Sequence, residues 1–337
     1  MNILFDINHP VDVNFFKNAM LSLKNDGHNV SVIFRRRGKL EKILRYELSM
    51  FPITMIGGHK KGFLNKIVSQ LSRDCKIVPY IKKNDIDLIV CFGATAAISS
   101  WYCKIPYLAF DDDFEYKIPF YHANWFSTKH IYPDMIEFSN RKTVKYHGFK
   151  ELAYLHSKYL DVSDKILNEY LIKPNTYVFI REISNVSLNY QDNNSILKQI
   201  VNKLKEKGLT IVLSLEDKSI QRYYDDDCIV LEEPVTDIYS LMYYSLFAIS
   251  SGDTVARETA LLGIPTIYTG GRTMSVNNAL IKAGAMFEVN DYCSVEELID
   301  LLTIDKKNEN RKNIADLINN KWDDTTSVIL NQINAFK

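Results

Sequence analysis

The sequence predicts an α/β protein made of two doubly wound domains in tandem. Short apolar segments alternate with segments of helical periodicity along most of the chain, a pattern typical of parallel sheets covered by helices. The chain also has 337 residues, and a single domain typically contains roughly 100–200. We therefore expect two parallel sheets, each with helices on both faces, and a cleft between the domains as the default ligand site.

The alternation loosens once, between Tyr146 and Pro174, and then restarts. This interruption predicts a domain boundary. The expected parts are a first domain over 1–150, a linker over 151–174, a second domain over 175–320, and a C-terminal helix over 321–337 that packs back on the first domain.

The first half opens with a short apolar strand, Ile3–Ile7, followed by apolar residues at helical spacing as far as Gly27. Further strands are expected at short apolar runs, and helices where apolar residues recur every three or four positions. The expected strands are Val30–Phe34, Ile53–Ile56, Leu88–Phe92, Tyr107–Phe110 and Trp125–Thr128, and the expected helices are Phe63–Ile81 and Thr95–Tyr102.

The second half repeats this organisation. Its expected strands are Tyr177–Arg181, Thr210–Ser214, Ile229–Leu231, Phe247–Ser250 and Thr266–Tyr268. Its expected helices are Ser195–Lys207, Ile238–Tyr244, Val255–Leu262, Asn277–Ala283 and Val295–Leu302. A polar segment, Asp305–Asn313, and a last helix near Thr325–Ile333 close the chain.

Composition narrows the class of protein. Lys plus Arg equals Asp plus Glu, 41 of each, so the overall charge gives no reason to expect a nucleic-acid partner. The five cysteines show neither a CxxC pair nor metal-ligand spacing, which indicates reduced thiols. No apolar run approaches the roughly 20 residues of a membrane span, and no signal peptide is apparent. We expect a cytoplasmic protein that is able to contact the inner face of a membrane peripherally.

The most informative segment is SSGDTVARETALLGIP, residues 250–265. Small residues follow an expected strand and open a helix whose first turn has free N–H groups, and such a helix start attracts phosphate. Glu258 lies about one turn further along, where a carboxylate can accept hydrogen bonds from a ribose diol. The segment predicts a nucleotide-sugar site that includes Ser251, Gly252, Asp253, Thr254 and Glu258.

Two other strand ends of the second domain fit this site. Arg181 follows the first strand and can reach a pyrophosphate; the alternative is an ordinary surface ion pair with Glu182. Gly271 and Arg272 end a later strand, where a Gly–Gly turn beside an arginine would suit a diphosphate.

In the first domain, His9 and Asp12 follow the first strand. Ligands in such sheets bind beyond the carboxyl ends of the strands, so both side chains are expected at a ligand. His9 can act as a general base or as a phosphate contact. For Asp12 the alternative is that it caps the following helix.

Two basic loops follow the next strands. Arg35–Arg37 can hold a phosphorylated ligand or a lipid headgroup, or can be an ordinary solvated loop. Gly57–Gly62 carries glycines and Lys60–Lys61, a weak anion-site signal. Together these clusters suggest an anionic acceptor or a membrane surface.

Three consecutive acids, Asp111–Asp113, follow the strand Tyr107–Phe110. Taken alone they resemble the Asp-x-Asp metal site of another glycosyltransferase fold, but a two-domain alternating pattern belongs to a class that usually needs no metal. We expect one of them, Asp112, to polarise or deprotonate an acceptor; helix capping is the alternative.

Several of these segments also carry a family likeness. The chain resembles the domain-of-unknown-function 354 family over nearly its whole length, which implies a GT-B-like fold of two Rossmann-like domains. The matching segments are Asp6–Pro10 with Phe15–Phe16, Gly27–His28, Ile105–Pro106 leading to Phe110–Asp112, Tyr146–Leu155 and Thr254–Pro265.

The last of these segments is also similar to the N-acetylglucosaminyltransferase of peptidoglycan synthesis and to the non-hydrolysing UDP-sugar 2-epimerases. In those groups a Ser-Gly turn precedes a glutamate that holds the ribose, five residues before a glycine, and Glu258 and Gly263 match that spacing. The chain departs from its family at Asp12, where a histidine is frequent, and at Gly252–Asp253, where Gly–Gly is frequent. An acid at position 253 would repel a nearby phosphate.

The resemblance implies a metal-independent GT-B glycosyltransferase of polysaccharide biosynthesis. It would transfer a sugar from a nucleotide-diphosphate donor, expected to be UDP-linked, to a surface-glycan or lipid-linked acceptor, with no other cofactor. His9, Asp12 and Asp112 are the candidate catalytic residues. One alternative is a 2-epimerase-like enzyme that eliminates and re-adds the nucleotide. Another is a nucleotide-sugar-binding protein without catalysis.

Overall fold

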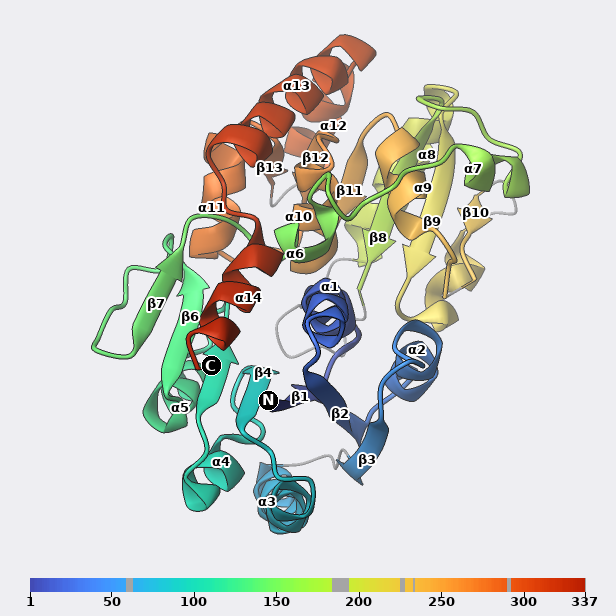
Figure 1. Cartoon of the computed structure of the whole chain (residues 1–337). Helices are drawn as coiled ribbons and strands as arrows, with labels where there is room; N and C mark the ends of the chain where they lie inside the picture. Colours follow the sequence, from blue (N-terminus) through green and yellow to red (C-terminus); the bar gives the residue numbers. More distant parts are fainter. Residues whose placement is uncertain (59–62, 184–193, 225–227, 233, 290–291, 337) are drawn as a thin grey trace. The chain divides into compact units, whose positions relative to one another are not determined.

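The computed structural model describes the whole chain except residues 59–62, 184–193, 225–227, 233, 290–291 and 337. The chain divides into two compact units (Figure 1). Unit 1 comprises Met1–Tyr159 and Trp322–Lys337, and unit 2 comprises Leu160–Lys321. The described part of the chain contains no helix long and apolar enough to cross a membrane.

Unit 1 is built on a parallel sheet in the order β3-β2-β1-β4-β5-β6-β7. The order reverses between β1 and β4, as in doubly wound sheets. The strands are β1 (Asn2–Ile7), β2 (Asn29–Arg36), β3 (Ile53–Gly58), β4 (Leu88–Phe92), β5 (Tyr107–Phe110), β6 (Lys129–Pro133) and β7 (Thr143–Tyr146). The predicted doubly wound first domain is confirmed.

The helices of unit 1 form two groups. In the first group α1 contacts α2, α6 and α14, and in the second α4 contacts α3 and α5 (Figure 1). The helices are α1 (Pro10–Asn25), α2 (Leu40–Glu47), α3 (Phe63–Lys83), α4 (Ala97–Cys103), α5 (Lys117–Phe126), α6 (Leu152–Leu155) and α14 (Thr325–Asn334).

Strand β1 shows how the sheet separates the two groups. Successive side chains of a strand point to opposite faces. Phe5 packs edge-to-face on Phe16 of α1, with 5.2 Å between ring centroids, whereas Leu4 joins the apolar cluster that contains Ile77 of α3. Asp6 lies on the same face as Leu4 and is fully buried, so the sheet carries a charged group into its interior.

Unit 2 contains a second parallel sheet, in the order β10-β9-β8-β11-β12-β13, which reverses between β8 and β11. Its strands are β8 (Tyr177–Glu182), β9 (Thr210–Leu215), β10 (Ile229–Val230), β11 (Ala248–Ser250), β12 (Thr266–Tyr268) and β13 (Met286–Glu288). Its helices are α7 (Lys165–Glu169), α8 (Asn194–Glu206), the 3₁₀ helix η1 (Lys218–Tyr223), α9 (Ile238–Tyr244), α10 (Asp253–Leu261), α11 (Ser275–Lys282), α12 (Tyr292–Leu301) and α13 (Ile304–Asn320).

One predicted strand is wrong. Trp125 and Phe126 end α5 rather than forming a strand, and β6 begins only at Lys129. The polar segment Asp305–Asn313 lies within α13, which buries Lys307, Asn310 and Ile314. Aromatic runs favour strands only on average, and the tertiary context overrides that tendency at Trp125 and Phe126.

The segment expected as a linker, 151–174, belongs to unit 1 up to Tyr159 and to unit 2 from Leu160 onward. The segment expected as a C-terminal helix belongs to unit 1 from Trp322 onward. Helix α6, in the expected linker, contacts α1 and α14. Helix α14 is tied to the same region, because Thr325 donates to the carbonyl of Phe149 at 2.7 Å and Thr326 to that of Ala153 at 2.8 Å. These bonds join the chain's last helix to unit 1.

Candidate functional site

Helix α10 begins at the point where the sheet of unit 2 reverses its order. Strand β11 ends at Ser250, and Gly252, in extended conformation, is the N-cap of α10. In doubly wound sheets this reversal point is the usual ligand site. A helix that starts there presents its first N–H groups and its positive dipole end to a ligand. The structure therefore places a helix N-terminus at the predicted segment.

The carboxylate of Asp253 is held by partners from the next strand and loop. Arg272 donates to its Oδ2 at 2.7 Å, the hydroxyl of Tyr268 donates to its Oδ1, and Asn277 lies 3.5 Å away. The negative charge that was expected to repel a phosphate is thus paired with a guanidinium. The pair also holds Arg272 beside the start of α10.

The turn that carries Arg272 requires its glycines. A Cβ on Gly270 would lie 2.5 Å from the carbonyl oxygen of Ser251, because the turn packs directly on the loop before α10. Gly271 has a φ of +67°, a conformation that favours glycine. The Gly–Gly pair therefore allows the close approach of Arg272.

Glu258 is almost fully buried within α10. The hydroxyl of Tyr239, in α9, donates to its Oε1 at 3.1 Å. Tyr239 could not be identified from the sequence, because only the tertiary fold brings its hydroxyl to Glu258. A carboxylate oriented in this way can accept hydrogen bonds from vicinal hydroxyl groups.

The other predicted residues of unit 2 join strand ends. Arg181 donates to the hydroxyl of Ser214 at 2.7 Å. The hydroxyl of Ser251 accepts the N–H of Ile183 at 3.0 Å and so connects the ends of β8 and β11. Thr254, the second residue of α10, is half-buried. Glu182 is buried rather than on the surface, and burial raises the pKa of its carboxyl to about 7.

In unit 1, Asp12 closes the first turn of α1. Its Oδ2 accepts the N–H groups of Asn8 and His9, each at 2.9 Å. Asp12 therefore makes the contacts of a helix-capping residue, the alternative role that its position in the sequence suggested. Burial raises the pKa of this carboxyl to about 7, although both N–H groups and the charge of Lys150 act in the opposite direction.

His9 is the N-cap residue of α1 and lies at the carboxyl end of β1. The guanidinium of Arg37 contacts its Nε2. Because an arginine side chain only donates, this contact fits an imidazole whose Nε2 is the acceptor. The unprotonated nitrogen is the form that a general base requires.

The three consecutive acids have separate partners. Asp111 accepts the N–H groups of Asp112 at 2.9 Å and of Asp113 at 3.1 Å, which forms a turn after β5. Asp113 accepts the N–H of Tyr116 at 3.2 Å. Asp112 pairs with Lys150 at 2.7 Å, and both side chains are buried. The described residues contain no group of three or more metal-type ligands.

Lys150 connects two of the predicted catalytic residues. It is paired with Asp112, and its charge opposes the rise that burial causes in the pKa of Asp12. Its ammonium lies 5.1 Å from the centroid of the Phe92 ring. His9, Asp12 and Asp112 thus share the carboxyl edge of the unit 1 sheet. Lys150 could not be identified from the sequence, because its partner Asp112 is distant along the chain.

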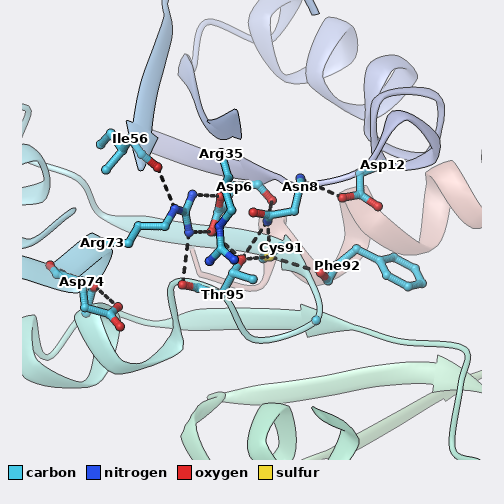
Figure 2. Close-up of polar contacts among 12 residues, drawn as sticks. Asp6, Asn8, Asp12, Arg35, Ile56, Arg73, Asp74, Cys91, Phe92 and Thr95 are labelled. Carbon is cyan, nitrogen blue, oxygen red and sulfur yellow. Dashed lines mark hydrogen bonds and ion pairs between the residues drawn. The ribbon is translucent and has the colours of Figure 1, made fainter. Parts of the chain in front are cut away.

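A buried ion pair lies beneath this edge (Figure 2). Arg73 of α3 makes a bidentate pair with Asp6, with distances of 2.8 and 2.5 Å, and its Nε donates to the carbonyl of Ile56 at 2.9 Å. Thr95 donates to Asp6 at 2.6 Å, and Asn8 donates to Thr95 at 2.7 Å. These bonds connect β1, β3, α3 and the loop after β4, and they hold the turn that carries His9.

Replacing Asp12 by Asn is expected to remove a pH-dependent loss of stability. The pKa of Asp12 is raised from 3.8 to about 7, so folding favours the protonated form. Its contribution is complete below about pH 4 and is lost as the pH rises to about 7. One pKa unit corresponds to about 1.4 kcal/mol. Wild type should therefore lose a few kcal/mol relative to Asp12→Asn across this range.

Urea unfolding followed by tryptophan fluorescence measures this effect, because Trp101, Trp125 and Trp322 all belong to unit 1. Asp26→Asn, an exposed acid at the end of α1, serves as the control and should show no such trend. A difference between wild type and Asp12→Asn that stays constant from pH 4 to 8 would contradict the assignment.

Comparison with known proteins gives one family and one fold. A family model described as "Protein of unknown function (DUF354)" matches residues 129–336. An uncharacterized protein of Methanocaldococcus jannaschii is 24% identical over 321 residues, which cover 89% of this chain and 90% of that protein.

Solved structures are similar over 99% of this chain. The UDP-GlcNAc 2-epimerase of Neisseria meningitidis bound to UDP-GlcNAc has a TM-score of 0.69 at 14% identity over 100% of that chain. The M. jannaschii UDP-GlcNAc 2-epimerase in complex with UDP-GlcNAc and UDP has a TM-score of 0.70 at 14% identity, also over its whole length. MurG of Acinetobacter baumannii has 0.63 at 13%, again over 100%. These similarities show that the fold is GT-B.

Proposed function

Because the chain belongs to the DUF354 family and has the GT-B fold, we propose that it is a glycosyltransferase with a nucleoside-diphosphate sugar as donor. Unit 2 binds the donor and unit 1 binds the acceptor, of the surface-glycan or lipid-linked class. The proposal takes UDP as the nucleotide, by analogy with the neighbouring structures that contain UDP or UDP-GlcNAc.

The observation that carries the proposal is the start of α10. Gly252 opens this helix at the reversal point of the sheet, and Arg272 is held beside it by Asp253. The diphosphate lies at the helix start and takes Arg272 as a partner. Glu258, oriented by Tyr239, accepts the ribose hydroxyl groups. An anion site and a carboxylate on one helix match the two polar parts of a nucleoside diphosphate.

In the proposed reaction, His9 is the general base. The acceptor hydroxyl gives its proton to Nε2 of His9 and its oxygen bonds to the anomeric carbon of the donor sugar. The bond from that carbon to the diphosphate breaks, and the nucleoside diphosphate leaves. Asp12 holds the turn of His9 through its N–H. Asp112, paired with Lys150, orients the acceptor. The helix start and Arg272 stabilise the departing diphosphate.

Binding of UDP tests the donor assignment. UDP is expected to raise the melting temperature of the wild type through ligand linkage, equivalent to about 2.7 kcal/mol at 100 times its dissociation constant. Glu258→Gln should weaken UDP binding about 10-fold or more, since a charged acceptor for the ribose diol is lost. Calorimetric titration gives the affinities directly.

Glu297→Gln is the matched control, because it makes the same change at an exposed position of α12 and should bind UDP as wild type does. Equal UDP affinity in Glu258→Gln and wild type would contradict the ribose assignment. Incubation with UDP-GlcNAc alone provides a second test: conversion of the sugar without an acceptor would replace the transferase with the 2-epimerase, and UDP binding without any turnover across an acceptor panel would indicate a binding protein.

A further inference from the structure

Two arginines at the end of β2 lie beside the turn of His9. Strand β2 ends at Arg36, its pairing with β3 is irregular between Phe34 and Arg36, and Arg37 is the first residue of the loop that follows. Arg36 is 70% exposed and lies 4.0 Å from Glu41 of α2. Arg35 instead contacts Gln70 of α3, and Arg37 contacts His9. The end of β2 and the loop after it thus place Arg35 against α3 and Arg37 against His9.

The guanidinium of Arg35 is held by a neutral group. Its Nη2 donates to the amide oxygen of Gln70, and the amide nitrogen of Gln70 donates to the carbonyl of Thr95 at 2.7 Å. The Nε of Arg35 is buried and has no hydrogen-bond partner among the described residues. Figure 2 shows Arg35 beside the Asp6–Arg73 pair. The side chain is fixed in place, yet retains a buried donor to satisfy.

The nearby carboxylates are already engaged. Asp6 accepts both terminal nitrogens of Arg73, and Asp74 accepts Gln70 at 3.0 Å and the hydroxyl of Ser99 at 2.5 Å. Burial lowers the pKa of Arg35, and the charges of Arg73 and Arg37 lower it further, against the opposite effect of Asp6 and Asp74. Positive charge therefore exceeds what the local acids neutralise, and an incoming anion would relieve the excess.

A hydrogen-bond acceptor lies at the same edge. Asn8 is 9% exposed, and its side-chain nitrogen donates to Thr95. Its Oδ1 is buried without a partner within the described part of the chain. A ligand that carries a hydroxyl beside an anionic group would satisfy both Asn8 and Arg35. The geometry favours a phosphorylated polyhydroxy compound over a simple anion.

We propose that Arg35 and Arg37 form a subsite for a phosphate ester of the acceptor, and that its occupation draws Arg37 away from Nε2 of His9. The base is then available only when a phosphorylated acceptor is bound. This inference rests on the proposed function for the role of His9, but the subsite itself is independent of donor binding in unit 2.

Binding of a hexose 1-phosphate tests the subsite, with UDP present at saturation to fill the diphosphate site proposed for unit 2. Calorimetry should show binding to the wild type, weakened about 10-fold or more in Arg35→Gln and in Arg37→Gln, since each loses a charge-assisted hydrogen bond. Arg36→Gln is the matched control and should bind as wild type does. NMR of histidine-labelled protein should show the imidazole pKa of His9 rising when the phosphate binds, because Arg37 leaves.

Phosphatidylglycerol vesicles distinguish a lipid-linked source of the phosphate from a soluble one. Co-sedimentation that depends on Arg35 and Arg37 but not on Arg36 supports the subsite with a lipid phosphate as ligand. Equal losses of binding in Arg35→Gln, Arg36→Gln and Arg37→Gln, or no binding of any probe to the wild type, would overturn the subsite. So would phosphate binding that persists in Arg35→Gln and disappears in Arg272→Gln, since that site is in unit 2. If UDP does not bind but the phosphate probe still binds through Arg35 and Arg37, the donor assignment is contradicted and the subsite is still supported.

Discussion

Replacing Arg73 by Met is expected to lower the free energy of unfolding of unit 1 by about 3–5 kcal/mol, the usual cost of removing one partner from a buried ion pair. Arg73 and Asp6 are both essentially inaccessible to solvent. Methionine fills part of the volume but leaves the Asp6 carboxylate without its bidentate partner. The carbonyl of Ile56 also loses its donor.

Urea unfolding followed by tryptophan fluorescence reports this loss, because all three tryptophans belong to unit 1. Adding Asp6→Asn to Arg73→Met should restore a large part of the stability, since the uncompensated charge is then absent. The matched control is Arg45→Met. Arg45 is 62% exposed and pairs with Glu41 one turn away on α2, and such surface pairs contribute roughly 0–1 kcal/mol. Equal effects of Arg73→Met and Arg45→Met would contradict a structural role for the buried pair.

Replacing His9 by Asn is expected to lower kcat of sugar transfer by about 10²- to 10⁴-fold, the range of a lost general base. Asparagine is a favoured N-cap residue, so α1 keeps its start and the fold is retained. The amide cannot take the proton that the Nε2 of His9 is positioned to accept. UDP binding should be unchanged, because His9 belongs to unit 1 and the donor is assigned to unit 2.

The rate of UDP release in the presence of an acceptor measures this effect, and the UDP affinity provides the internal check. His122→Asn, in α5, is the control histidine. It packs on Phe126 with 5.1 Å between ring centroids and should retain wild-type turnover. A His9→Asn variant with wild-type turnover would remove His9 from the mechanism, whereas a variant that loses UDP affinity would contradict the assignment of donor and base to different units.

The sequence predicted those features of the candidate site that depend on residues close together in the chain. The segment that follows β11 combines small residues, a helix start and an acid at fixed spacing, and the structure places a helix N-terminus there at the reversal point of the sheet. The turn of Gly270 and Gly271 was also recognisable, because a close backbone approach and a positive φ both require glycine. The family was recognisable from such segments, and it is confirmed.

The partners of the charged groups were not predictable. Asp6 and Arg73 are separated by 67 positions, and nothing near either residue indicates the other. The same is true of Asp112 with Lys150. Asp253 and Arg272 were both expected at the nucleotide-sugar site, but their ion pair was not. Asp253 shows the consequence: taken alone it is an obstacle to phosphate, and its pairing makes it the group that holds Arg272 at the helix start.

By itself the sequence determined the α/β fold class, the doubly wound alternation of strands and helices, and the strand ends at which ligands are expected. Apolar periodicity, glycine turns and helix starts are properties of neighbouring residues, so they can be read along the chain. Only the tertiary structure decided which acids are structural caps, which are paired, and which side chains the arginines after β2 contact. Those outcomes depend on strand order and on side-chain burial, which bring residues from distant segments within hydrogen-bond distance.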